Sequence, residues 1–162
     1  MTDWTAPKTF ASGDVGTAAE MNTYLRDNEL HLKERFAGST FWSVTMDTER
    51  TTTSDTVVDV TGTTLAVTVA RASDVIVVAS FNAKTNDYLF GSYYYLYRDS
   101  TYIGLRAVEW RETYQCAGLV AFDDNVAAGT YTYRLKYSRA EAGGGTVYAD
   151  QVVLSVLVIP TV

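Results

Sequence analysis

Two glutamates, Glu109 and Glu112, are of the residue type that cleaves glycosidic bonds, and they flank Trp110 and Arg111. Glycosidases place a pair of carboxylic acids on either side of the bond that they break. The surrounding pattern is that of a β-strand, and residues three apart on a strand point to opposite faces. The two carboxylates are therefore not expected to converge, and the pair does not predict an enzyme. A depolymerase is the weakest of the functions considered.

The residues needed for other catalytic chemistry are scarce. Nucleophilic catalysis needs a base beside a serine or cysteine, and the chain has one histidine, His31, and one cysteine, Cys116. A zinc site would have to take most of its ligands from carboxylates. No phosphate-binding glycine loop, dinucleotide-binding motif or HExxH motif occurs. We expect no catalytic residue, no metal and no cofactor.

An acidic run, Asp123, Asp124 and Asn125, has oxygen ligands of the kind that calcium prefers. Three adjacent residues rarely converge on one ion, so the run is interpreted as a plain turn.

Aromatic side chains are the remaining candidates for binding. The chain has 12 tyrosines and 3 tryptophans, and most of the tyrosines are expected in the core or in contacts between subunits. Four aromatic residues lie near predicted turns, where a stacking ring would be exposed. The candidate glycan contacts are Tyr88, Tyr102, Trp110 and Tyr114.

Composition narrows the class of protein. The 162-residue chain has a formal net charge of −6 and no basic run, which argues against nucleic-acid binding. It has no apolar run of the ~18 residues that a membrane span needs. No signal peptide is visible at the start, so we expect folding in a cytosol, which does not decide where the protein ends up.

From residue 41 onward, apolar residues alternate with polar ones, as in half-buried strands. Glycine, asparagine and aspartate separate the runs at intervals typical of turns. We predict a mainly β fold, an antiparallel β-sandwich of the jelly-roll type. Its nine predicted strands are 41–47, 56–60, 65–70, 75–84, 88–98, 102–110, 114–122, 131–138 and 147–159.

Three of these strands are apolar on both faces, which an antiparallel sandwich with one solvated face does not require. They include Val75–Val78, Tyr93–Tyr97 and Val152–Ile159. A second cover is therefore expected, either the N-terminal arm and helix or another subunit. Tyrosine suits an interface between subunits, so Tyr93, Tyr95 and Tyr97 are candidate interface residues.

The N-terminal part differs from the rest. Residues 1–16 are polar and turn-rich, Thr17 and Glu20 form a capping box, and a helix is expected from Ala18 to Phe36 before Gly38. We therefore divide the chain into an arm and helix, residues 1–38, and a β-sandwich head, residues 39–162.

One face of this helix has heptad spacing. The candidate seam consists of Met21, Leu25, Asn28 and Leu32, followed by Arg35. An asparagine at a seam position can set register and strand number in a coiled coil. The helix either lies on its own head domain or associates with copies of itself, and we favour self-association.

The first 28 residues resemble the start of phage virion proteins, especially tail-fibre and receptor-binding-like ones. The matching positions are Trp4, Pro7-Lys8-Thr9, Gly13-Asp14-Val15, Thr17-Ala18-Ala19 and Asn22-Thr23-Tyr24-Leu25-Arg26-Asp27-Asn28. This resemblance implies a virion component that is attached to other virion proteins through residues 1–38.

The head resembles the jelly-roll heads of the tumour-necrosis-factor and complement globular-head families. The matching phrases are Tyr95-Leu96-Tyr97-Arg98-Asp99, the stretch Ala128–Leu135 and the strand Val152–Ile159. Such heads are usually trimers packed through aromatic strands, which implies a homotrimer. No long fibrous shaft lies between arm and head, so a compact knob or decoration fits better than a thin fibre.

Together these observations predict a non-enzymatic bacteriophage virion structural protein. It would be an oligomeric knob, fibre or decoration component that is attached by its N-terminus and is able to contact a host surface glycan. The alternative is a carbohydrate-binding β-sandwich module.

Overall fold

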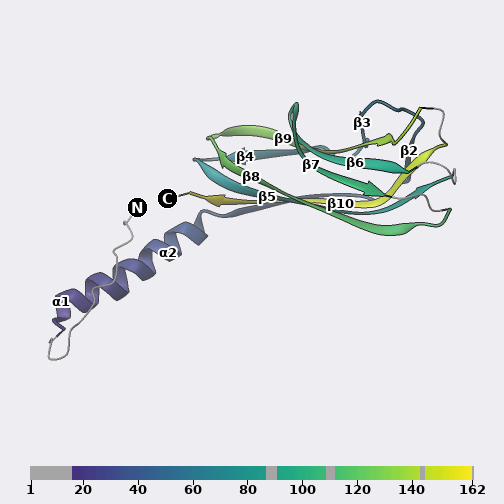
Figure 1. Ribbon diagram of the computed structural model, residues 1–162. Coiled ribbons are helices and arrows are strands. Elements are labelled where there is room, and N and C mark those ends of the chain that lie inside the picture. Colours follow the sequence, from purple (N-terminus) through teal and green to yellow (C-terminus); the bar gives the residue numbers. More distant parts are fainter. Residues whose placement is uncertain (1–15, 87–90, 109–111, 143–144, 162) are drawn as a thin grey trace.

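The computed structural model describes residues 16–86, 91–108, 112–142 and 145–161, with only the backbone given for residues 21, 22, 24, 27 and 34–36. It consists of a helical segment followed by a β-sandwich (Figure 1). The helical segment comprises α1 (Ala18–Met21), the π-helical turn η1 (Asn22–Asp27) and α2 (Asn28–Ala37).

Ten strands are found in the described part of the chain. Nine of them correspond to the nine predicted runs, with ends that differ by a few residues. The short strand β2 was not predicted, because its three polar residues show no apolar alternation. The strands are β1 (Thr40–Met46), β2 (Arg50–Thr52), β3 (Val58–Asp59), β4 (Leu65–Val69), β5 (Ser73–Thr85), β6 (Ser92–Arg98), β7 (Thr101–Val108), β8 (Gln115–Val126), β9 (Gly129–Arg139) and β10 (Val147–Pro160).

The predicted capping box is confirmed at the start of the helix. The Glu20 backbone N–H donates to Thr17 Oγ1 at 3.2 Å, and the Thr17 backbone N–H donates to Glu20 Oε2 at 2.8 Å. The helical segment then runs to Ala37, and Gly38 follows it as predicted. In Figure 1 the helix projects away from one end of the sandwich, where it leads directly into β1.

The strands form two five-stranded antiparallel sheets. Sheet I has the order β1-β10-β5-β8, with β2 pairing the early part of β10, and sheet II has the order β3-β9-β6-β7, with β4 also pairing β9. Sequential strands cross between the sheets several times, as in a jelly roll. The predicted fold class, a mainly β sandwich with a short N-terminal helix, is confirmed.

The two sheets are joined by a core of alternating side chains. Val77 and Phe81 of β5 face Tyr94 and Leu96 of β6, and all four are nearly inaccessible to solvent. The rings of Phe81 and Tyr94 lie 4.4 Å apart, and the Tyr94 hydroxyl donates to the backbone carbonyl of Tyr148 in the opposite sheet. Burial raises the pKa of Tyr94 well above its usual value, because the ionised phenolate would lack solvent.

A buried ion pair also links the sheets, and it corrects the interpretation of the acidic run. Asp123 and Asp124 lie within β8 and not in a turn. Asp123 is buried and accepts hydrogen bonds from Arg98 Nη1 at 2.8 Å and from the Tyr133 hydroxyl at 3.1 Å. Burial, with the nearby Asp123 charge, raises the pKa of Tyr133. The turn prediction failed because the partners of Asp123 come from distant strands.

Edge strands β7 of sheet II and β8 of sheet I pack closely against each other at Gly104. A Cβ atom built on Gly104 would lie 3.1 Å from the Cβ of Ala121. Glycine at this position therefore permits the close packing of the two edges.

Candidate functional site

The outer face of sheet I carries three consecutive rows of paired residues without a single charge. The pairing across β1, β10, β5 and β8 places one residue of each strand in each row. We call this surface the apolar face. Its rows are Phe41, Leu157, Ile76 and Phe122, then Ser43, Ser155, Val78 and Val120, then Thr45, Val153, Ser80 and Gly118.

Large side chains of the apolar face are open to solvent. Phe41 and Phe122 are each 68% exposed, and Val120 is 56% exposed. The sequence predicted a cover for the two-sided strands of this sheet, yet the helix of the same chain projects away from the sandwich (Figure 1). Among the described residues, none covers these exposed side chains.

The helix exposes leucines as well. Leu25 and Leu32, which are seven residues apart in the predicted seam, are 61% and 45% exposed, whereas Asn28 between them is buried. The π-helical turn before Asn28 shifts the angular position of the residues that precede it relative to those that follow. The side chain of Met21 lies outside the described part of the chain, and self-association through this helix stays a prediction.

The outer face of sheet II is aromatic. Tyr93, Tyr95 and Tyr97 alternate along β6 with side chains of the core, and Tyr102 of β7 pairs with Tyr97. The rings of Tyr95, Tyr97 and Tyr102 contact one another at centroid distances of 6.0 to 6.5 Å, in edge-to-face orientations. Exposed Leu105 pairs with Tyr95. We call this surface the tyrosine face.

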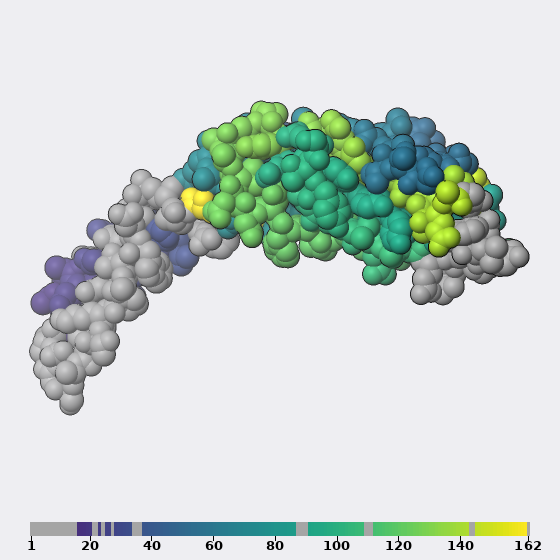
Figure 2. Space-filling view, turned by 45° about the horizontal axis from the view of Figure 1, so that its top comes forward, coloured from purple at the N-terminus to yellow at the C-terminus, as the bar shows by residue number. Residues whose placement is uncertain are grey.

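Charged residues from neighbouring strands border the tyrosines. Lys136 of β9 pairs with Tyr95 in register, and its Nζ lies 4.7 Å from the ring centroid of Tyr97. Lys136 Nζ also lies 2.9 Å from Asp59 Oδ1, and Arg134 Nη1 lies 3.8 Å from Asp59 Oδ2. Two cations therefore share one carboxylate. Figure 2 views this side of the molecule, with the teal atoms of β6 and β7 in the middle of the body.

A third cluster lies on the outer side of sheet I, beyond the apolar face. Lys84 Nζ is held between the rings of Tyr114 and Tyr148, at 4.2 and 4.3 Å from their centroids. Glu49 pairs with Lys84 at 3.6 Å and accepts a hydrogen bond from the Tyr114 hydroxyl. These groups satisfy one another, so the cluster fastens neighbouring segments to the sheet.

The two candidate glycan contacts that the structure describes, Tyr102 and Tyr114, lie on different surfaces. Tyr102 belongs to the tyrosine face, whereas Tyr114 belongs to the Lys84 cluster on the other sheet. Tyr88 and Trp110 lie outside the described residues, as does Glu109 of the candidate carboxylate pair.

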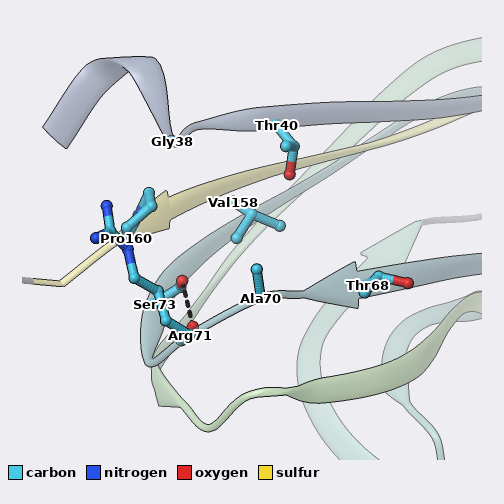
Figure 3. Close-up of a pocket in the computed structure, with 8 residues that line it drawn as sticks. All are labelled: Gly38, Thr40, Thr68, Ala70, Arg71, Ser73, Val158 and Pro160. Carbon is cyan, nitrogen blue, oxygen red and sulfur yellow. Dashed lines mark hydrogen bonds between the residues drawn. The ribbon is translucent and has the colours of Figure 1, made fainter. Parts of the chain in front are cut away.

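One pocket lies at the junction of the helix and the sandwich, with a volume of about 270 Å³. Figure 3 shows residues of β10 and of the segment after β4 on its sides, with the Ser73 hydroxyl donating to the backbone carbonyl of Arg71 at 2.7 Å. Its lining is mostly small and aliphatic and offers no acid–base pair. It is lined by Gly38, Thr40, Thr68, Ala70, Arg71, Ser73, Val158 and Pro160.

Among the described residues, no group of three or more His, Cys, Asp and Glu side chains could hold a metal ion. Within the same ranges, no helix is long and apolar enough to cross a membrane.

Phe41, Val120 and Phe122 were not singled out from the sequence. The run Leu119–Phe122 is apolar at every position, which is the same two-sided signal that marked the other strands. That signal would have identified β8 as part of the apolar face.

No protein-family model matches the sequence, and no curated protein matches it either. Among solved structures, a chain of the tripod from the baseplate of bacteriophage Tuc2009 is similar, with 14% identity, a TM-score of 0.49 and coverage of 98% of this chain and 80% of that one. A chain of infectious bursal disease virus, Gt strain, has 10% identity and a TM-score of 0.51, over 75% of this chain and 33% of that one. The Gx strain gives 12% identity and a TM-score of 0.50 over 75% and 32%. Our chain spans about a third of those two viral chains, and identities this low show a shared fold alone.

Proposed function

We propose that this protein is a non-enzymatic structural component of a bacteriophage virion whose copies assemble through the apolar face. Residues 1–38 attach the assembly to other virion proteins, and the sandwich forms a compact knob or decoration. The observation that carries the proposal is the set of charge-free rows on the outer face of sheet I.

Association through the apolar face would gain free energy by removing exposed apolar side chains from water. Apolar surface gains about 25 cal/mol for each Å² removed from water, and a phenylalanine side chain offers 150–250 Å². At 68% exposure, Phe41 and Phe122 each leave roughly 100–170 Å² uncovered in a single copy, which is worth ~2.5–4 kcal/mol per ring when buried. Contiguous exposed apolar surface of this kind marks an interaction site.

The tyrosine face fits a contact between copies less well. The centres of protein interfaces are depleted of charged residues, and Arg134, Lys136 and Asp59 lie directly beside the tyrosines. We therefore propose that the copies contact one another through the apolar face, and not through Tyr93, Tyr95 and Tyr97 as the sequence predicted. The copy number of three is carried over from the resemblance to trimeric jelly-roll heads, although those heads pack through aromatic strands and the contact proposed for this protein does not.

The setting in a virion rests on other observations. The N-terminal motif resembles the start of phage tail-fibre and receptor-binding-like proteins, and the helix that bears its last part projects from the head (Figure 1). Leu25, Leu30 and Leu32 of the helix are exposed and available for contacts outside the chain. Chains of infectious bursal disease virus share the sandwich fold.

Mass measurement in solution tests the assembly. The wild-type protein should have the mass of three 17.8 kDa chains, and Val120→Lys should shift it to one chain by placing an ammonium group within the apolar face. Leu105→Lys is the matched control, because Leu105 is a similarly exposed aliphatic residue on the other sheet. A monomeric wild-type protein at high concentration, or an unchanged mass for Val120→Lys, would refute the proposal.

Particle incorporation tests the attachment. Deletion of residues 1–38 should abolish incorporation into purified particles while the remaining sandwich keeps its β circular dichroism. Normal incorporation of the shortened protein would contradict the anchoring role.

A further inference from the structure

We infer that the tyrosine face is a binding surface for an acidic saccharide, one that carries carboxylate or phosphate groups. The inference rests on the proposed function in one respect: copies that associate through the apolar face of sheet I leave the opposite face, on sheet II, open to solvent. The surface is defined by Tyr93, Tyr95, Tyr97, Tyr102, Arg134 and Lys136.

The aromatic part of the surface is accessible and held in place. Tyr102 is 51% exposed, although its ring contacts Tyr95 at 6.3 Å and Tyr97 at 6.0 Å. Such contacts fix the rings before a ligand arrives, so little side-chain entropy is lost on binding. Sugar rings present C–H groups on one side, and these groups can stack against an exposed aromatic ring.

The hydroxyl groups of the tyrosines are available. Tyr95 shares a hydrogen bond of 3.2 Å with Ser138 Oγ. Within the described part of the chain, the hydroxyls of Tyr93, Tyr97 and Tyr102 have no hydrogen-bond partner. A phenolic hydroxyl both donates and accepts, as do the hydroxyls of a saccharide.

The charge of the surface is opposite to that of the whole protein. The chain carries a net charge of −6, yet Arg134 and Lys136 share only Asp59, which leaves one positive charge beside the rings. Asp59 is exposed, so its ion pairs are weakened by water and salt and can be exchanged for ligand contacts. An acidic group on a saccharide would supply the missing counter-charge.

The other surfaces formed by the described residues lack this combination. Lys84 is already paired with Glu49 and enclosed by two rings. The apolar face has no charged group, and the junction pocket lacks aromatic residues. The tyrosine face alone, among the described residues, joins one exposed and three half-buried aromatic rings with unpartnered hydroxyls and an excess positive charge.

Calorimetric titration of the full-length protein tests the inference with defined probes. One arm uses an oligogalacturonate, which carries carboxylates, one uses a glycerol-phosphate teichoic acid, and a neutral cello-oligosaccharide is the control. We expect one of the two acidic probes to bind and the neutral probe to bind at least about tenfold more weakly, which corresponds to ~1.4 kcal/mol. Affinity should fall as salt is added, because the charges are near the surface.

Substitutions test whether the acidic probe binds at the tyrosine face. Tyr102→Ala and Lys136→Gln should each weaken the acidic probe about tenfold, or ~1.4 kcal/mol. Tyr114→Ala and Lys33→Gln are the matched controls on other surfaces, and they should bind as the wild type does. Absence of binding by both acidic probes, or equal binding by the neutral probe, or equal losses in the control variants, would overturn the inference.

Val120→Lys separates this inference from the proposed function. The variant should lose self-association and keep the affinity of each chain for the acidic probe. A wild-type protein that assembles but binds no acidic probe leaves the assembly standing and removes the saccharide site.

Discussion

Replacement of Asp123 by alanine should lower the free energy of unfolding by about 3–4 kcal/mol. The Asp123 side chain is 10% exposed and receives two contacts of 2.8 Å from Arg98 and one of 3.1 Å from Tyr133. Its loss leaves the buried Tyr133 hydroxyl unsatisfied, at a cost of ~1–3 kcal/mol. Breaking a buried pair by removing one ion costs about 3–5 kcal/mol, and the lower part of the range applies because Arg98 is 23% exposed and can reach water.

Urea unfolding followed by the fluorescence of Trp42, which packs against the core, measures this cost. The midpoint should fall while the slope with denaturant stays the same. Asp124→Ala is the matched control, because Asp124 is the exposed neighbour on the same strand, and its effect should stay within about 0.5 kcal/mol. Tyr133→Phe should cost only about 1 kcal/mol. If Asp123→Ala and Asp124→Ala were equally stable, the linking role of the ion pair would be wrong.

Three further predictions concern single side chains. Because the folded chain holds the Tyr94 proton more tightly than the unfolded chain, the contribution of Tyr94 to stability is fully present below about pH 10. Above that pH this single group lowers the free energy of unfolding by ~1.4 kcal/mol per pH unit. Tyr94→Phe should reduce that slope in alkaline urea titrations, and an unchanged slope would contradict the assignment. Gly104→Val should cost about 1–3 kcal/mol in thermal unfolding, because its side chain would collide with Ala121. Thr17→Ala should weaken the helix by about 1 kcal/mol, measured by circular dichroism, whereas Thr17→Ser should retain the cap; equal losses would exclude the capping bond.

Local patterns predicted much of the fold. The capping box at Thr17 and Glu20 depends on residues three apart, and the alternation that marks β4 and β9 depends on residues two apart. Both signals lie within a few residues of the chain, so they can be recognised without knowing the topology. β2 was missed because its pairing with β10 comes from a strand nearly one hundred residues away.

The apolar face and the tyrosine face were harder to predict, because each depends on which strands pair and on the register of that pairing. Alternation placed Tyr93, Tyr95 and Tyr97 on one face, but the cations beside them come from β9. Their exposed neighbour Tyr102 comes from β7, the other strand of the same hairpin. The apolar face combines strands from both ends of the chain, including β1 and β10. No short stretch of sequence contains either set.

The junction between α2 and β1 determines how the molecule would carry mechanical load. Only Gly38 and Ser39 separate the helix from β1, which is an edge strand whose residues 40–46 pair antiparallel with residues 158–152 of β10. A pull on the helix along the axis of β1 would strain all hydrogen bonds of this ladder in shear, so that none could break alone. The force would pass into sheet I, and the tyrosines of sheet II would keep their arrangement while the helix is under tension.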